Sequence, residues 1–135
     1  MKDDIWTLGR SSTTTTNTPP ANSGKVRLIT LWIVSGLLAL AFLGAGGAKL
    51  AGAAAMVEIF NKVGLGQWFR YFTGLLEVAG AIGLLISRYA FYAAILLALV
   101  MVGAIIAHIT VLGTSPAAPI VLLALSGTIA YLRKP

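Results

Sequence analysis

The 135-residue chain contains no cysteine and few charged side chains, and both absences limit what it can do. Without cysteine there are no disulfides, no thiol redox chemistry and no cysteine-ligated metal or iron–sulfur sites. Charged residues make up only 10% of the chain and hydrophobic residues 58%, which is typical of membrane proteins rather than soluble globules. The sequence also has no P-loop, dinucleotide fingerprint, zinc-protease helix or nucleophile motif, so no common enzyme class is indicated.

The longest stretch without Lys, Arg, Asp or Glu runs from Tyr89 to Leu132, over 44 residues. A helix rises about 1.5 Å per residue, so about 20 residues cross the hydrocarbon of a bilayer and this stretch is enough for two crossings. Pro116 and Pro119 divide it, because proline lacks an N–H and clashes with the preceding helical turn. The sequence therefore predicts two transmembrane helices here.

The remaining apolar runs complete a predicted all-α fold, a bundle of four transmembrane helices. The predicted helices are Leu28–Ala48, Tyr71–Ser87, Tyr89–Leu112 and Ala117–Leu132. Between the first two, apolar residues recur at i, i+3, i+4 and i+7 from Met56 to Val63, which predicts a short amphipathic helix in the membrane interface. The polar, low-complexity residues 1–27 predict a disordered cytoplasmic leader, and residues 28–135 the transmembrane domain.

The basic residues are distributed unevenly about these four spans. One side would carry Lys2, Arg10, Lys25, Arg27, Arg88, Arg133 and Lys134, and the other Lys49, Lys62 and Arg70. The positive-inside rule then predicts that both termini are cytoplasmic in a bacterial or archaeal cytoplasmic membrane. The net charge of +6 is read as this bias and not as nucleic-acid binding. The expected interfacial anchors are Trp32, Trp68, Arg70, Tyr71 and Arg88.

Small residues are expected where the helices pack closely, because transmembrane helices associate through close backbone approach. The candidates are Gly36, Gly44, Gly47 and Ala48 in the first helix, Gly74, Gly80, Ala81 and Gly83 in the second, and Gly103, Ala104 and Ala107 in the third.

Three ionisable residues, Lys49, Glu77 and His108, are predicted at similar depths near one membrane face. The first helix ends at Lys49, Glu77 lies about 9 Å into the second, and His108 lies about 12 Å before the turn at Pro116. A lone carboxylate in hydrocarbon costs several kcal/mol, so Glu77 should find a cation. Such a cluster is able to handle a proton or to bind the carbonyl oxygens of a quinone or similar amphiphile.

Plainer interpretations of the same residues stay open. In one interpretation, Lys49 and Glu77 form a structural pair that sets the helix register. In a second interpretation, the His108 imidazole is simply hydrogen-bonded to a backbone carbonyl. Lys49 alone is also an ordinary helix-end anchor. No metal site is expected, and no second transmembrane histidine is present to form a bis-histidine haem site.

Three segments together resemble the DoxX-like family of small four-helix membrane proteins. They are Phe42–Leu50 with a Gly-x-x-Lys pattern, Phe72–Ala81 with Gly-x-x-Glu, and Ala104–His108 with Ala-x-x-x-His. The resemblance covers about residues 28–132 and implies a four-helix bundle. Because the family includes a membrane subunit of an archaeal thiosulfate:quinone oxidoreductase, it also implies a link to quinone redox chemistry by analogy.

Three functions are compatible with the sequence. The first is an accessory subunit of a membrane redox complex, without catalytic activity of its own, whose polar pocket takes a quinone-like molecule. The second is a structural subunit that packs on a larger membrane complex or on further copies of itself. The third, a proton-coupled carrier of small solutes, is disfavoured because no inverted repeat or broken span is evident.

Overall fold

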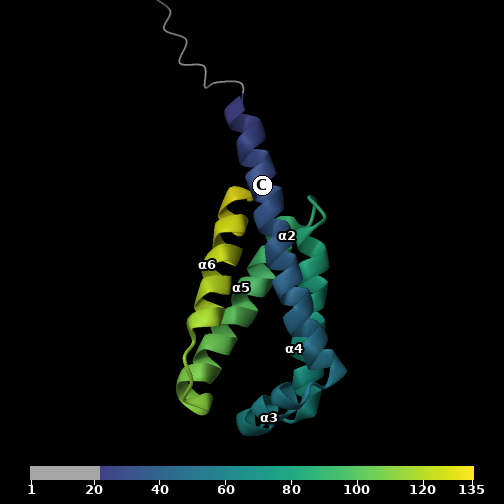
Figure 1. Cartoon of the computed structure of the whole chain (residues 1–135), viewed down its shortest axis with the longest axis vertical. Helices are drawn as coiled ribbons and strands as arrows, with labels where there is room; N and C mark the ends of the chain where they lie inside the picture. The colour runs from purple at the N-terminus through teal and green to yellow at the C-terminus, as the bar shows by residue number, and fades with distance from the viewer. Residues whose placement is uncertain (1–21) are drawn as a thin grey trace, which may run out of the picture.

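The computed structural model describes residues 22–135, and this part of the chain is all-helical, without a β-strand. Its elements are α2 (Asn22–Ala51), α3 (Ala54–Val63), α4 (Gln67–Leu84), α5 (Ala90–Ala107), the π-helical turn η1 (His108–Leu112) and α6 (Ala117–Leu132). Figure 1 shows α2, α4, α5 and α6 alternating in direction, with α3 lying across one end. Helix α2 contacts α4, α4 contacts α5, α5 contacts α6, and α6 contacts α2, so the four long helices close into a bundle.

The helix order matches the prediction, and the boundaries differ in places. Helix α2 begins at Asn22, so residues 22–27, which we assigned to the leader, form its first turns. Residues 1–21 lie outside the described part. Helix α4 runs from Gln67 to Leu84 and is shifted toward the N-terminus relative to the predicted 71–87, because Gly66, with a φ of 96°, allows an early start.

Helix α3 confirms the short helix predicted between the first two long ones. It ends at Gly64, whose φ of 81° is left-handed and whose N–H donates to the Phe60 carbonyl. Phe60 is the buried residue of this helix, and its ring lies 5.9 Å from that of Phe69 on α4. Helix α3 thus packs on the start of α4 and closes one end of the bundle.

Glycine allows α2 and α4 to cross closely. A Cβ on Gly46 would lie 2.8 Å from the Gly74 carbonyl oxygen, and one on Gly74 would lie 2.9 Å from the Lys49 Cβ. Of the predicted packing glycines, Gly74, Gly80 and Gly83 are confirmed, whereas a Cβ on Gly36, Gly44, Gly47 or Gly103 would meet nothing within 4 Å. The crossing uses Gly46 instead, because only one face of α2 meets α4.

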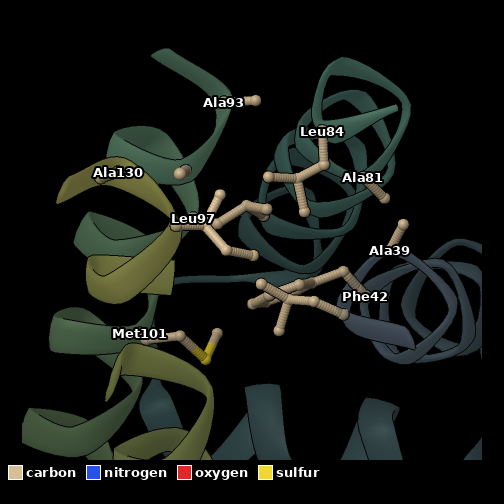
Figure 2. Close-up of a cluster of buried hydrophobic side chains, with 11 residues drawn as sticks. Ala39, Phe42, Ala81, Leu84, Ala93, Leu97, Met101 and Ala130 are labelled. Carbon is tan, nitrogen blue, oxygen red and sulfur yellow. The ribbon is translucent and has the colours of Figure 1, made fainter. Parts of the chain in front are cut away.

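The hydrophobic core occupies the half of the bundle that lies away from α3. Phe42, Leu84 and Leu97 are fully buried there and come from three different helices. Figure 2 shows Phe42 and Leu97 reaching toward each other from α2 and α5, with Met101 below them. The cluster comprises Leu38, Ala39, Phe42, Ala81, Leu84, Ala93, Ala94, Leu97, Met101, Ile129 and Ala130. Apolar packing therefore joins all four long helices in this half.

Two helical stretches of the described chain, Ser23–Ala51 and Ala90–Leu112, are long and apolar enough to cross a membrane. Helix α6 is apolar but shorter. Large apolar side chains are also exposed on the outer faces, among them Leu37, Leu40 and Leu99. This distribution fits a protein whose outer surface meets lipid.

Candidate functional site

A cavity of about 480 Å³ lies in the half of the bundle nearest α3. All five α-helices and η1 contribute to its wall, which is mostly aliphatic and aromatic. Its ionisable wall residues are Lys49, Glu77 and His108, the three residues singled out in the sequence. The structure therefore brings all of them to one cavity, where a few polar groups lie in apolar surroundings.

Lys49 and Glu77 form an ion pair across the crossing of α2 and α4. The Lys49 Nζ lies 3.0 Å from Glu77 Oε2, and the exposed fractions of the two side chains are 14% and 2%. The pair is adjacent to the contact between Gly46 and Gly74, which brings the two backbones together. The buried carboxylate thus has a cation, while the lysine keeps N–H groups that can be donated elsewhere.

Arg70 is buried and binds the end of α2 that carries Lys49. Its guanidinium donates to the main-chain carbonyl of Lys49, at the C-terminal end of α2, and to Gln67 Oε1 at 2.7 Å. The Gln67 amide in turn donates to the Val57 carbonyl at 3.2 Å and to Asn61 Oδ1 at 2.8 Å. One chain of hydrogen bonds therefore ties α2, α3 and α4 together beneath the cavity.

His108 begins the π-helical turn that extends α5. Its Nδ1 lies 2.7 Å from Thr114 Oγ1, and its carbonyl accepts the Gly113 and Thr114 N–H groups. The imidazole is thus oriented by a side-chain hydroxyl and not by the backbone carbonyl of the plainer interpretation. Its second nitrogen, Nε2, is left for another partner. A π-helical turn is uncommon and is often found at functional sites.

Aromatic rings form the wall beside α3. The rings of Phe69 and Phe72 lie 6.3 Å apart, and both side chains line the cavity. The Trp68 ring packs against both, with its centroid 5.7 Å from that of Phe69 and 6.3 Å from that of Phe72. Two of the aromatic residues that follow α3 therefore form part of the site.

The predicted anchors divide into two groups. Trp32, Trp68 and Tyr71 are 40, 64 and 50% exposed, and Arg88 is exposed next to the Tyr89 ring. Arg70 is only 4% exposed, so it does not face outward as an anchor would. The physical reason is its set of buried partners at the end of α2. Membrane anchoring by the other four stays a prediction.

Sequence reasoning missed Gln67, Arg70 and Thr114 as supports of the site. Gln67 and Arg70 are three residues apart at the start of a helix, a spacing at which side chains meet, and this signal was available. Thr114 follows the helix break, and no sequence pattern relates it to His108.

The fold and the cavity define a class: a small helical protein with an apolar exterior and an ion pair buried in its bundle. Comparison with known families makes this specific. The chain belongs to the DoxX-like family, whose sequence model matches residues 33–129. All residues that line the cavity fall within this range. Membership suggests a small membrane protein in contact with the lipid bilayer. Comparisons with curated proteins and with solved structures found no match.

Proposed function

We propose that this protein is a four-span membrane subunit that binds a quinone-like molecule in its cavity and serves a larger redox complex. The observation that carries the proposal is one mostly apolar cavity with Lys49, Glu77 and His108 on its wall. Binding sites for small lipid-soluble molecules have this composition, in which a few polar groups orient a ligand that is otherwise held by apolar contacts.

The polar groups have distinct roles in this proposal. The Lys49 ammonium keeps donors beyond its bond to Glu77, and one of them can bind a ligand carbonyl. When Nδ1 of His108 accepts a hydrogen bond from the Thr114 hydroxyl, the ring proton is on Nε2, which can donate to a second ligand carbonyl. The aromatic wall at Phe69 and Phe72 suits a planar ring. Electrons for reducing a bound quinone would come from a redox centre of the partner complex.

The binding test compares variants of the site with a matched control. Glu77→Gln and His108→Ala should each weaken binding of menadione, a naphthoquinone, about tenfold, because each removes a group that holds or supports a carbonyl contact. Glu58→Gln is the control, since Glu58 is exposed, pairs with Lys62 at 3.7 Å and lies outside the cavity. Quenching of the nearby Trp68 fluorescence reports binding. Equal affinity in all four proteins, wild type included, would reject the pocket.

The proposed topology has four spans with both termini in the cytoplasm. In this topology the shorter helices α4 and α6 also cross the membrane, and the N-terminal part of α2 and the C-terminal end of α6 lie on the side opposite α3 (Figure 1). The absence of cysteine makes the test direct, because a single introduced cysteine is the only reactive thiol. A thiol reagent that does not cross the membrane should label Ser87→Cys only from the cytoplasmic side and Thr114→Cys only from the other. The reverse pattern, or labelling of both from one side, contradicts this topology.

The accessory role is tested by gentle extraction. Native mass spectrometry of the complex in mild detergent should show this chain with a larger redox partner. A chain that keeps its partner when the cavity variants lose quinone binding still fits the proposal. A chain that has a partner but whose wild type binds no quinone is a structural subunit instead.

A further inference from the structure

We propose that the seam between α4 and α5 holds the apolar tail of a ligand whose polar head occupies the cavity. The inference rests on the proposed function and names its ligand class, a lipid-soluble molecule with a long hydrocarbon tail. It is carried by two adjoining hollows of the structure, the cavity near α3 and a shallower groove beyond it.

The cavity opens sideways at this seam. Helices α4 and α5 touch closely near their connection, where a Cβ on Gly80 would lie 2.6 Å from the Leu97 side chain. Toward α3 the facing residues line the cavity instead. Three of them are also exposed: Phe72 at 48%, Leu99 at 65% and Gly103. A Cβ on Gly103 would meet nothing within 4 Å. A residue that is both exposed and part of the cavity wall lies at its mouth.

The groove continues from this mouth along the outside of the same seam. It has a volume of about 370 Å³ and is lined on α4 by Ala79, Ile82 and neighbouring small residues, and on α5 by Tyr92 and Leu96. Leu96 also lines the cavity, so the two hollows adjoin. The groove wall is almost entirely apolar and holds no charged residue.

This geometry selects the occupant. A head held at Lys49 and Glu77 has α3 beneath it, where Phe60 is buried and Gln67 is hydrogen-bonded to two residues of α3. A chain attached to that head can leave through the open mouth at Gly103. It then lies in the apolar groove, facing lipid, where a hydrocarbon chain loses no hydration. An isoprenoid or alkyl tail has this chemistry, whereas a polar substituent would be desolvated at a cost.

The experiment measures two ligands with one head. Menadione has no tail, and phylloquinone is the same ring with a phytyl tail. Gly103→Phe at the mouth and Ala79→Phe in the groove should each weaken phylloquinone binding about tenfold more than menadione binding, the factor that a modest steric overlap produces. The matched controls are Gly127→Phe and Ala41→Phe, at exposed positions outside both hollows, and they should leave the ratio of the two affinities unchanged.

The outcomes separate this inference from the proposed function. Wild-type binding of both ligands, with a changed ratio in Gly103→Phe and Ala79→Phe alone, supports the seam. An unchanged ratio in both variants overturns it and leaves the head pocket standing. A change that appears instead in Ala118→Phe, on the exposed α6 part of the cavity wall, places the tail elsewhere and also overturns it. Binding of neither ligand by the wild type rejects the pocket and the seam together.

Discussion

The two halves of this bundle are held together in different ways. In the half that lies away from α3, apolar side chains from all four long helices fill the interior, and Phe42, Leu84 and Leu97 are fully buried. In the half near α3, the helices surround a cavity, and the buried groups include Arg70 and Glu77. One half is packed directly, and the other relies on a polar network at its base.

The contrast shows what each half is suited to do. Membrane helices gain little from leaving lipid, so close packing and interhelical hydrogen bonds decide where they stay together. The packed half supplies the close packing, and its interior leaves no room for a ligand. The open half supplies the interhelical hydrogen bonds, through Arg70 at the end of α2 and the ion pair of Lys49 with Glu77. These bonds hold the helices in place around the cavity.

The largest expected effect is in the packed half. Leu97→Ala should destabilise the protein by about 4 kcal/mol, because it removes a fully buried side chain and leaves a void. Leu99→Ala is the control on the same helix, since Leu99 is 65% exposed at the cavity mouth, and its cost should be below about 1 kcal/mol. Unfolding by SDS in mixed micelles measures both. Similar losses in the two variants would remove the distinction between the halves.

The ion pair should dominate in the open half. Lys49→Met leaves the Glu77 carboxylate buried without its cation, and the expected cost is about 3 kcal/mol. The double variant Lys49→Met with Glu77→Met should recover much of this loss, because no lone charge remains. Lys62→Met, in the exposed pair with Glu58, should change stability by less than about 0.5 kcal/mol. A double variant no more stable than Lys49→Met contradicts the pairing.

The crossing of α2 and α4 at Gly46 and Gly74 should respond to a single added methyl group. Gly46→Ala places a Cβ 2.8 Å from the Gly74 carbonyl oxygen, so α2 and α4 must separate, at a cost of about 2 kcal/mol. Gly44→Ala, two residues earlier with open space around it, should be neutral or slightly stabilising. Thermal denaturation of the two variants provides the comparison. A neutral Gly46→Ala would mean that α2 and α4 do not approach closely at Gly46 and Gly74.

The smallest effect concerns two serine hydroxyl groups that are buried in the packed half. Ser35 and Ser126 are fully buried, and within residues 22–135 their hydroxyls have no hydrogen-bond partner. Ser35→Ala should therefore be neutral or stabilise by up to about 1 kcal/mol, since an unsatisfied hydroxyl is removed. Thr128→Ala serves as the control, because its hydroxyl donates to the Ala124 carbonyl at 2.8 Å on an exposed face. A marked loss of stability in Ser35→Ala would mean that the Ser35 hydroxyl is hydrogen-bonded.

The order of the helices and the meeting of Lys49, Glu77 and His108 at one level followed from the sequence, whereas the direction in which each helix face points did not. The depths of Lys49, Glu77 and His108 come from helix lengths, which the apolar runs and prolines fix. Whether a glycine packs against a neighbouring helix depends on the helix face on which it lies. In this chain the outward-facing and interior positions are equally apolar, so the periodicity of apolar residues carries little information about that face. Gly46 was therefore missed in favour of Gly44 and Gly47.

Arg70 illustrates the other kind of error. A basic residue among aromatic residues at a helix start is typical of an interfacial anchor, and that interpretation considers only its own segment. Its partners, the Lys49 carbonyl and the Gln67 side chain, become visible only when α2 and α4 are placed together. Long-range partners of this kind are decided by the tertiary arrangement and not by local pattern.

The π-helical turn at His108–Leu112 has a consequence for chain length. A π turn accommodates one residue more than an α turn, so deleting a single residue there would let α5 continue in regular α-helical spacing. The six-residue separation at which Thr114 Oγ1 lies 2.7 Å from His108 Nδ1 would then be shortened by one residue, and the hydrogen bond that orients the imidazole would be lost. The segment between His108 and Pro116 is thus sensitive to length as well as to composition.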